Sequence, residues 1–171
     1  MSILNIVLYP DDPLTRKAEP VETFGPELEA LAADMLETMH VYDGVGLAGP
    51  QVGLSQQILV LQEPDGEPMC LVNPELSAFE GSETGEEGCL SLPQVYADVP
   101  RATCIHVRAK DPAGNDLDFE ARNFLARIIQ HETDHLNGIV FPDRADILTR
   151  QAKLAEWEDV RARLMAEAER T

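Results

Sequence analysis

The sequence predicts an α+β fold, in which short strands form antiparallel or mixed sheets packed around one central helix. Short apolar runs separated by turn signals occupy residues 58–120. A helical apolar pattern precedes these runs, and two longer helical patterns follow them. Strands that are grouped before helices, and do not alternate with them, are typical of this fold class.

Composition bounds the class of protein. A length of 171 residues with 44% hydrophobic residues suits a single domain covering residues 1–171. The formal net charge of −18 disfavours binding to DNA, which requires a positive surface. The three cysteines have no paired spacing, which indicates a reduced, cytoplasmic protein. We expect no membrane span, because no stretch is long and apolar enough to cross a bilayer.

The first part of the chain predicts an N-terminal helix and a glycine-rich loop. Residues 1–25 are irregular, and the helix covers residues 26–40 with Pro26 at a favourable first position. Residues 44–49 spell GxGxxG, but a preceding helix and a following Pro50 exclude the dinucleotide-binding motif, which needs a strand before it and a helix after it. The glycines instead permit close approach of a ligand to the backbone, and Gln51 supplies an amide there.

The middle of the chain predicts strands at residues 58–62, 69–72, 76–83, 95–99, 103–110 and 116–120. Cys70 and Cys104 lie in apolar runs and are expected in the core. His106 alternates with its apolar neighbours, which places it on the opposite, solvent-facing side of its strand. Two helices follow, at residues 122–136 and 147–169, and the second has an apolar side that includes Leu148, Trp157, Val160 and Leu164.

The helix at residues 122–136 carries the sequence HETDH, an HExxH motif. Residues four apart share one face of a helix, so His131 and His135 can bind one metal ion. Glu132 lies beside them as a candidate general base. A catalytic site of this kind takes a third protein ligand and leaves one position for water.

Several residues could supply that third ligand. One extension of the motif ends in a third His, but Phe141 stands there and cannot bind metal. Glu156 or Glu158 on the last helix would suit a zinc endopeptidase. Cys89 follows Gly88 in a polar, turn-like segment and could present a thiolate, which binds soft and borderline ions well.

Three segments together resemble the signature motifs of peptide deformylases. They are GVGLAGPQ at residues 44–51, EGCLS at 87–91 and QHETDH at 130–135, in the order and spacing of that family. The resemblance covers roughly residues 1–145 and extends to NPE at 73–75, VPR at 99–101 and LNG at 136–138. Gly49 stands where alanine is usual. A C-terminal helix at residues 147–169 resembles that of the larger bacterial-type members.

The resemblance implies a metal-dependent hydrolase that removes the formyl group from the N-terminal formylmethionine of newly made proteins and releases formate. It implies Fe²⁺ as the ion, although Zn²⁺, Ni²⁺ or Co²⁺ would also suit the same ligands. A transient contact with the ribosome is a further expectation, which the mixed charge of the last helix does not favour. The alternatives are the zinc endopeptidase and a deformylase-like binding module without activity.

The implied roles fall into three groups. The metal ligands are Cys89, His131 and His135; the catalytic groups are Glu132, the Gln51 amide and the Leu90 N–H; and the substrate-binding residues are Gly44, Val45, Gly46, Glu87, Phe124 and Ile128. The substrate would bind in extended form beside residues 44–46. Glu87 and Arg101 are expected to form an ion pair near the site.

Overall fold

The computed structural model describes residues 2–170 and confirms the α+β class with an N-terminal, a central and a C-terminal helix. The helices and strands, in chain order, are α1 (Pro26–Val41), β1 (Gly46–Ala48), the 3-10 helix η1 (Gly49–Val52), β2 (Ile58–Leu61), β3 (Met69–Glu80), β4 (Glu83–Cys89), β5 (Leu92–Arg101), β6 (Cys104–Lys110), β7 (Asp116–Arg122), α2 (Asn123–Leu136), the 3-10 helix η2 (Phe141–Arg144) and α3 (Ile147–Glu169).

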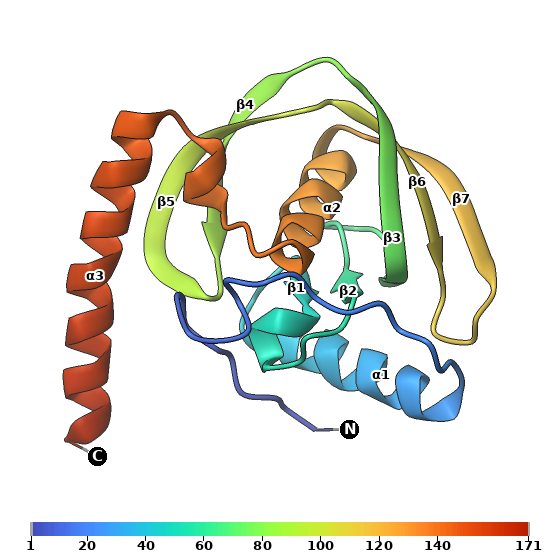
Figure 1. Ribbon diagram of the computed structural model, residues 1–171, viewed down its shortest axis with the longest axis horizontal. Helices are drawn as coiled ribbons and strands as arrows, with labels where there is room; N and C mark the ends of the chain where they lie inside the picture. Colours follow the sequence, from blue (N-terminus) through green and yellow to red (C-terminus); the bar gives the residue numbers. More distant parts are fainter. Residues whose placement is uncertain (1, 171) are drawn as a thin grey trace.

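The strands form two antiparallel sheets around α2. One has five strands in the order β1-β2-β3-β6-β7, and the other is the hairpin of β4 and β5. Figure 1 shows α2 at the centre of the molecule, with α1 below it and α3 at the edge beside β5. The chain therefore places its HExxH helix between the two sheets. Within residues 2–170, no helix has both the length and the apolar character required to cross a membrane.

Three groups of buried side chains hold these layers together. The first lies between α2 and the five-stranded sheet and includes Ile129 and Leu136. The second lies between α1 and the same sheet and contains Met35 and Met39. The third lies between β5, η2 and α3 and contains Trp157. α2 packs on the five-stranded sheet through the first group and is tied to the hairpin by Arg127, which donates to the Val99 and Glu83 carbonyls, so its histidines are fixed by the fold itself.

The helix boundaries follow local chemistry. Pro26 occupies the first turn of α1, where its missing N–H costs nothing. Asn137 caps α2, and Gly138 follows with a φ of 73°, a left-handed conformation that glycine adopts without strain. An ideal Cβ at Gly138 would lie 2.9 Å from the Thr15 carbonyl carbon, so the chain crossing there also requires glycine.

The structure corrects several sequence-based boundaries. Residues 69–80 form one strand where two were predicted. Asn73 takes a φ of 51° in the middle of this strand, and the pairing of β3 with β6 continues past it through a shift in register. Residues 83–89 form β4 where a turn-like segment was expected; its polar residues pair with β5, which is longer than predicted. The glycine-rich loop contains β1 and η1. Both are too short to produce a periodic signal in the sequence.

The solvent exposure of individual side chains confirms some sequence-based predictions and corrects others. His106 is half-buried between buried neighbours and pairs with Asp118, as alternation predicts. Cys104 is buried, and Cys70 is half-buried, with burial raising its pKa to about 12. On α3, Trp157 is buried as predicted, whereas Leu148 is 74% exposed. Leu148 lies in the first turn of α3 and is not part of the buried group between β5, η2 and α3.

Candidate active site

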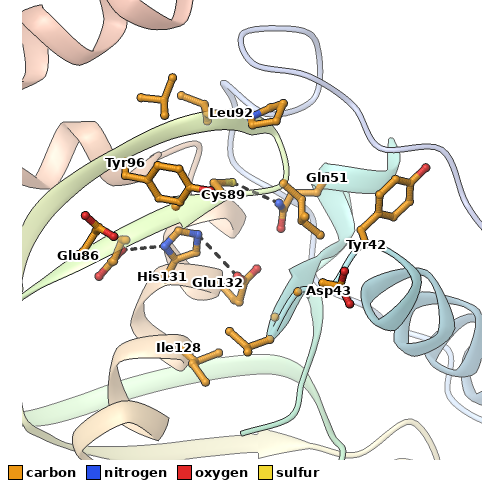
Figure 2. A pocket seen from close by; sticks show the side chains of 18 of the residues that line it. Tyr42, Asp43, Gln51, Glu86, Cys89, Leu92, Tyr96, Ile128, His131 and Glu132 are labelled. Carbon is orange, nitrogen blue, oxygen red and sulfur yellow. Dashed lines mark hydrogen bonds and ion pairs between the residues drawn. The ribbon is translucent and has the colours of Figure 1, made fainter. Parts of the chain in front are cut away.

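Two elements bring the predicted metal ligands together. His131 and His135 lie one turn apart on α2, and Cys89 is the last residue of β4. The ligand atoms of these three side chains lie within 4.8 Å of one another. Cys89 Sγ is 3.3 Å from His135 Nε2, and Figure 2 shows Cys89 above His131 at the wall of a pocket. Residues 46 positions apart in the chain thus share one site.

The donor set fits a divalent transition-metal ion. Sulfur and nitrogen ligands at tetrahedral angles around zinc-like ions lie about 3.5 Å apart, close to the separation of Cys89 Sγ and His135 Nε2. Three ligands leave one coordination position for water or substrate. Glu156 and Glu158 do not belong to this group, because both are exposed on α3 and Glu156 pairs with Lys153. Cys89 is therefore the third ligand. The alternative in which Glu156 or Glu158 completes the metal site of an endopeptidase is wrong.

The electrostatics of the two imidazoles differ. Burial lowers the pKa of His131, but hydrogen bonds with Cys89 and Glu87 outweigh burial and raise that pKa well above its ordinary value. Burial and the nearby charge of His131 lower the pKa of His135 well below its ordinary value. A neutral imidazole is the form that binds a metal. The surroundings therefore favour the neutral, metal-binding form of His135, whereas Cys89 and Glu87 favour the protonated form of His131.

Glu87 orients His131 from behind. Its Oε1 lies 2.8 Å from His131 Nδ1, which leaves Nε2 for the metal. Arg101 donates to both carboxylate oxygens at 2.9 Å, which confirms the predicted ion pair, and Arg127 donates to Oε2 at 2.6 Å. Burial opposes the charge on Glu87, but these hydrogen bonds, from His131 and Arg101 above all, lower its pKa to about 2. Glu87 is therefore an anion that is held by hydrogen bonds from three side chains.

Glu132 has the opposite environment. The residue is 4% exposed, and its Oε2 has no hydrogen-bond partner within the described part of the chain. Burial raises the pKa of Glu132 to about 7, the range in which a carboxylate accepts and returns protons. An ideal Cβ at Gly46 would lie 2.8 Å from Glu132 Cγ and Oε1. Glycine at position 46 is what lets β1 approach this carboxylate.

Gln51 reaches the same site from η1. It is 1% exposed, and its Oε1 accepts a hydrogen bond from the Ala48 N–H at 2.9 Å. Its Nε2 is thereby directed at the site, where it lies 3.4 Å from Cys89 Sγ and 3.3 Å from Ser91 Oγ. The amide is fixed at one end and presents its donor to the ligand group. Leu90 lies in the loop that joins β4 and β5 and lines the same cavity as Gln51.

A cavity of about 470 Å³ opens in front of the ligand group. The predicted substrate-binding residues all line it: Gly44, Val45, Gly46, Glu87, Phe124 and Ile128. Val45 and Phe124 are exposed at its rim, and Ile128 is buried in its wall. The predicted catalytic residues Gln51, Leu90 and Glu132 line the same cavity.

Sequence reasoning missed Arg127, Asp134 and Tyr96. Arg127 also donates to the Val99 and Glu83 carbonyls, and Asp134 accepts from Arg101 at 2.6 Å. Helical spacing could have found Arg127, which lies one turn before His131. Tyr96 packs so closely on Gly88 that an ideal Cβ there would lie 2.7 Å from its ring. That contact depends on the β4–β5 register, for which the sequence has no signal.

Known proteins share this architecture and much of this sequence. The polypeptide deformylase family model matches residues 3–151. The peptide deformylase of Desulforudis audaxviator is 43% identical over 152 residues, covering 88% of this chain and 99% of that protein. Peptide deformylase 1 of Bacillus subtilis is 42% identical over 159 residues, covering 92% and 99%. The crystal structure of the peptide deformylase from Thermus thermophilus superposes with a TM-score of 0.91 at 44% identity, covering 97% and 99%. Since the matched region contains the Cys–His–His group and these relatives align over nearly their whole length, the chain belongs to the polypeptide deformylase family.

Proposed function

We propose that this protein hydrolyses the formamide at the N-terminal formylmethionine of nascent polypeptides in the cytoplasm, releasing formate. One observation carries the proposal. A Cys–His–His ligand group, which leaves one coordination position open, lies beside the buried Glu132, whose Oε1 is 3.7 Å from His131 Nε2 and whose Oε2 has no hydrogen-bond partner within the described chain; His131 and Glu132 line a cavity of about 470 Å³. The donors suit several divalent ions, and the family resemblance favours ferrous iron among them.

A cation held by Cys89, His131 and His135 would polarise the formyl carbonyl and lower the pKa of a water molecule beside it. Glu132 accepts the proton of that water as the oxygen attacks the formyl carbon. Its raised pKa of about 7 makes the return of the proton easy. The same carboxyl then protonates the leaving amine as the C–N bond breaks. The water adds to the formyl group, and the products are formate and a free amino terminus.

The negative charge that develops on the formyl oxygen needs fixed donors. The Gln51 amide supports this role, because its Oε1 is bound to Ala48 and its Nε2 is aimed at the ligand group. The backbone N–H of Leu90 is the second donor in the proposal. Preorganised donors of this kind stabilise the transition state more than the ground state, since they need no reorientation during the reaction.

The sheet supports an extended substrate. β1 pairs with β2 along one side only and is an edge strand of the five-stranded sheet. A peptide can add to such an edge through main-chain hydrogen bonds. Its path along residues 44–46 would place the methionine side chain against Val45, Phe124 and Ile128, which line the cavity. The same path brings the formyl group to Glu132.

Formate release from a formyl-Met peptide tests the proposal. The parent protein, purified anaerobically with its metal, should release one formate per peptide, and Glu132→Ala should keep the metal and lose turnover. Cleavage of internal peptide bonds without formate release would instead indicate an endopeptidase. A metal-loaded parent protein with neither activity would indicate a binding module. Equal turnover by Glu132→Ala and the parent would remove Glu132 from its role.

A further inference from the structure

A continuous line of contacts joins the C-terminal helix to the cysteine ligand. The Trp157 Nε1–H of α3 donates to the Tyr9 carbonyl at 2.8 Å. The Tyr9 N–H donates to the Ser91 carbonyl at 2.9 Å. The Ser91 N–H in turn lies 3.4 Å from Cys89 Sγ. Three segments far apart in the sequence therefore meet behind the loop that carries the thiolate.

The side chains along this line of hydrogen bonds also pack together. Trp157 is 2% exposed and lies in the buried group between β5, η2 and α3. Tyr9 and Cys89 both pack against that group. A second tie holds the same N-terminal segment, since Arg161 on α3 donates to Asp11 at 2.9 Å. Figure 1 shows α3 alongside β5, next to the turn of the hairpin.

The cysteine is the ligand that needs such support. His131 and His135 lie on a helix that packs on the five-stranded sheet and is tied to the hairpin by the hydrogen bonds of Arg127. Cys89 instead ends β4 at an irregularity of register, beside the turn to β5. Hairpin turns move more than helix interiors, so the position of the sulfur depends on what packs behind the turn. Trp157 lies outside the region matched by the family model, which ends at residue 151.

We infer that α3 acts through Trp157 as a positioning element for Cys89, holding the thiolate in place for the metal by way of Tyr9 and Ser91. The inference rests on the metal centre of the proposed function. Trp157 does not line the cavity and touches no reacting atom. Its effect is on how long the metal stays bound.

Two full-length, metal-loaded variants separate this role from general stability. Trp157→Phe keeps an aromatic ring in the buried group and removes the N–H donor. Val160→Ala, one turn along the same face, removes packing and keeps the hydrogen bond. Metal release to a chelator and hydrogen exchange of the Tyr9 amide are measured for each, with thermal unfolding alongside. Trp157→Phe should speed metal release roughly fivefold, the equivalent of one lost hydrogen bond, and should speed exchange at Tyr9. Val160→Ala should lower the unfolding temperature, with a rate of metal release close to that of the parent.

Unchanged metal release in Trp157→Phe, or equal acceleration in both variants, would overturn the inference. The unmodified protein gives a test that needs no variant. Trp157 is the single tryptophan and is buried, so its fluorescence should be that of a buried indole. The Tyr9 amide, which donates to the Ser91 carbonyl, should be protected from exchange. An exposed indole or an unprotected amide would also overturn it. A parent protein that bound no metal would refute the proposed function, whereas a metal-loaded parent with unresponsive variants would refute this inference alone.

Discussion

The contacts of Glu87 make it the side chain whose neutralisation should most directly disturb the metal centre. Its two oxygens lie within 2.9 Å of donor atoms on Arg101, Arg127 and His131. Glu87→Gln keeps the shape of the side chain and replaces one acceptor oxygen with an NH₂ group. That group would face an arginine or the His131 ring, so a buried donor loses its acceptor. The change also leaves the arginines with less compensating charge.

The size of the effect follows from burial. The carboxylate and the Arg101 side chain are 5% and 4% exposed, so solvent screens their interaction little. Breaking a buried pair of this kind costs about 3–5 kcal/mol. For a chain of this length, that loss lowers the unfolding temperature by roughly 6–20 °C. Removing the partner that orients a metal-binding histidine typically weakens metal affinity by about 10–100-fold.

The assay is competition with a chelator, run on Glu87→Gln and on a matched control. Glu86→Gln is that control, since Glu86 is the adjacent residue of β4, loses the same charge and is exposed. Thermal unfolding of both variants measures stability separately. The control should match the parent in both measurements. If Glu87→Gln kept the metal affinity of the parent, the proposed orientation of His131 by Glu87 would be wrong, whatever happened to its stability.

Other changes at the same site allow four further tests. Gln51→Ala should lower kcat by about 10²–10³-fold with full metal content; loss of metal in proportion would mean that the amide only braces Cys89. Cys89→Ser should release or exchange the metal, and an unchanged metal content and spectrum would exclude the sulfur as a ligand. Gly46→Ala should lower kcat and keep the metal, because its Cβ would displace Glu132; an unaltered pH–rate profile would contradict this. Hydrogen bonds that outweigh burial lower the pKa of Glu87 from 4.5 to about 2, so its contribution to folding is present above pH 4.5 and is lost as the pH falls toward 2. Urea unfolding across that range should show this loss in the parent and not in Glu87→Gln.

The sequence predicted those parts of the fold whose pattern is periodic and local. The helices carry apolar residues at helical spacing, and their ends are set by residues such as Pro26 and Gly138, so their predicted bounds lie close to those of the structure. The HExxH spacing alone placed two ligands on one face. Residue chemistry alone could not identify the third ligand, because Cys89, Glu156 and Glu158 were all candidates. The family resemblance favoured Cys89, and the cluster of Cys89 with the two histidines in the structure confirmed it.

What escaped prediction depends on contacts between distant segments. The polar residues of β4 predicted a turn, because strand formation there depends on pairing with β5 and polar residues are tolerated on the outer face of that hairpin. Asp134 is surrounded by Arg101 and Arg144, which come from a strand and from η2. No local pattern indicates such a network, because each member reads as a surface charge. The sequence predicted a buried Trp157 on α3, but no local pattern indicated that its N–H donates to the Tyr9 carbonyl.

The charges of the C-terminal segment bear on its expected contact with the ribosome. Residues 143–171 contain six basic and seven acidic side chains, so the segment is not a basic surface. Five of the six basic residues are also engaged within the described part of the chain, in the pairs Arg144–Asp134, Arg150–Asp143, Lys153–Glu156, Arg161–Asp11 and Arg163–Gln94. Binding to RNA phosphates gains its free energy by releasing counterions from the nucleic acid as cations neutralise it, and cations already paired neutralise few phosphates. Because five of the six basic side chains are engaged in this way and acidic residues outnumber them, electrostatic docking of this segment on RNA is not favoured.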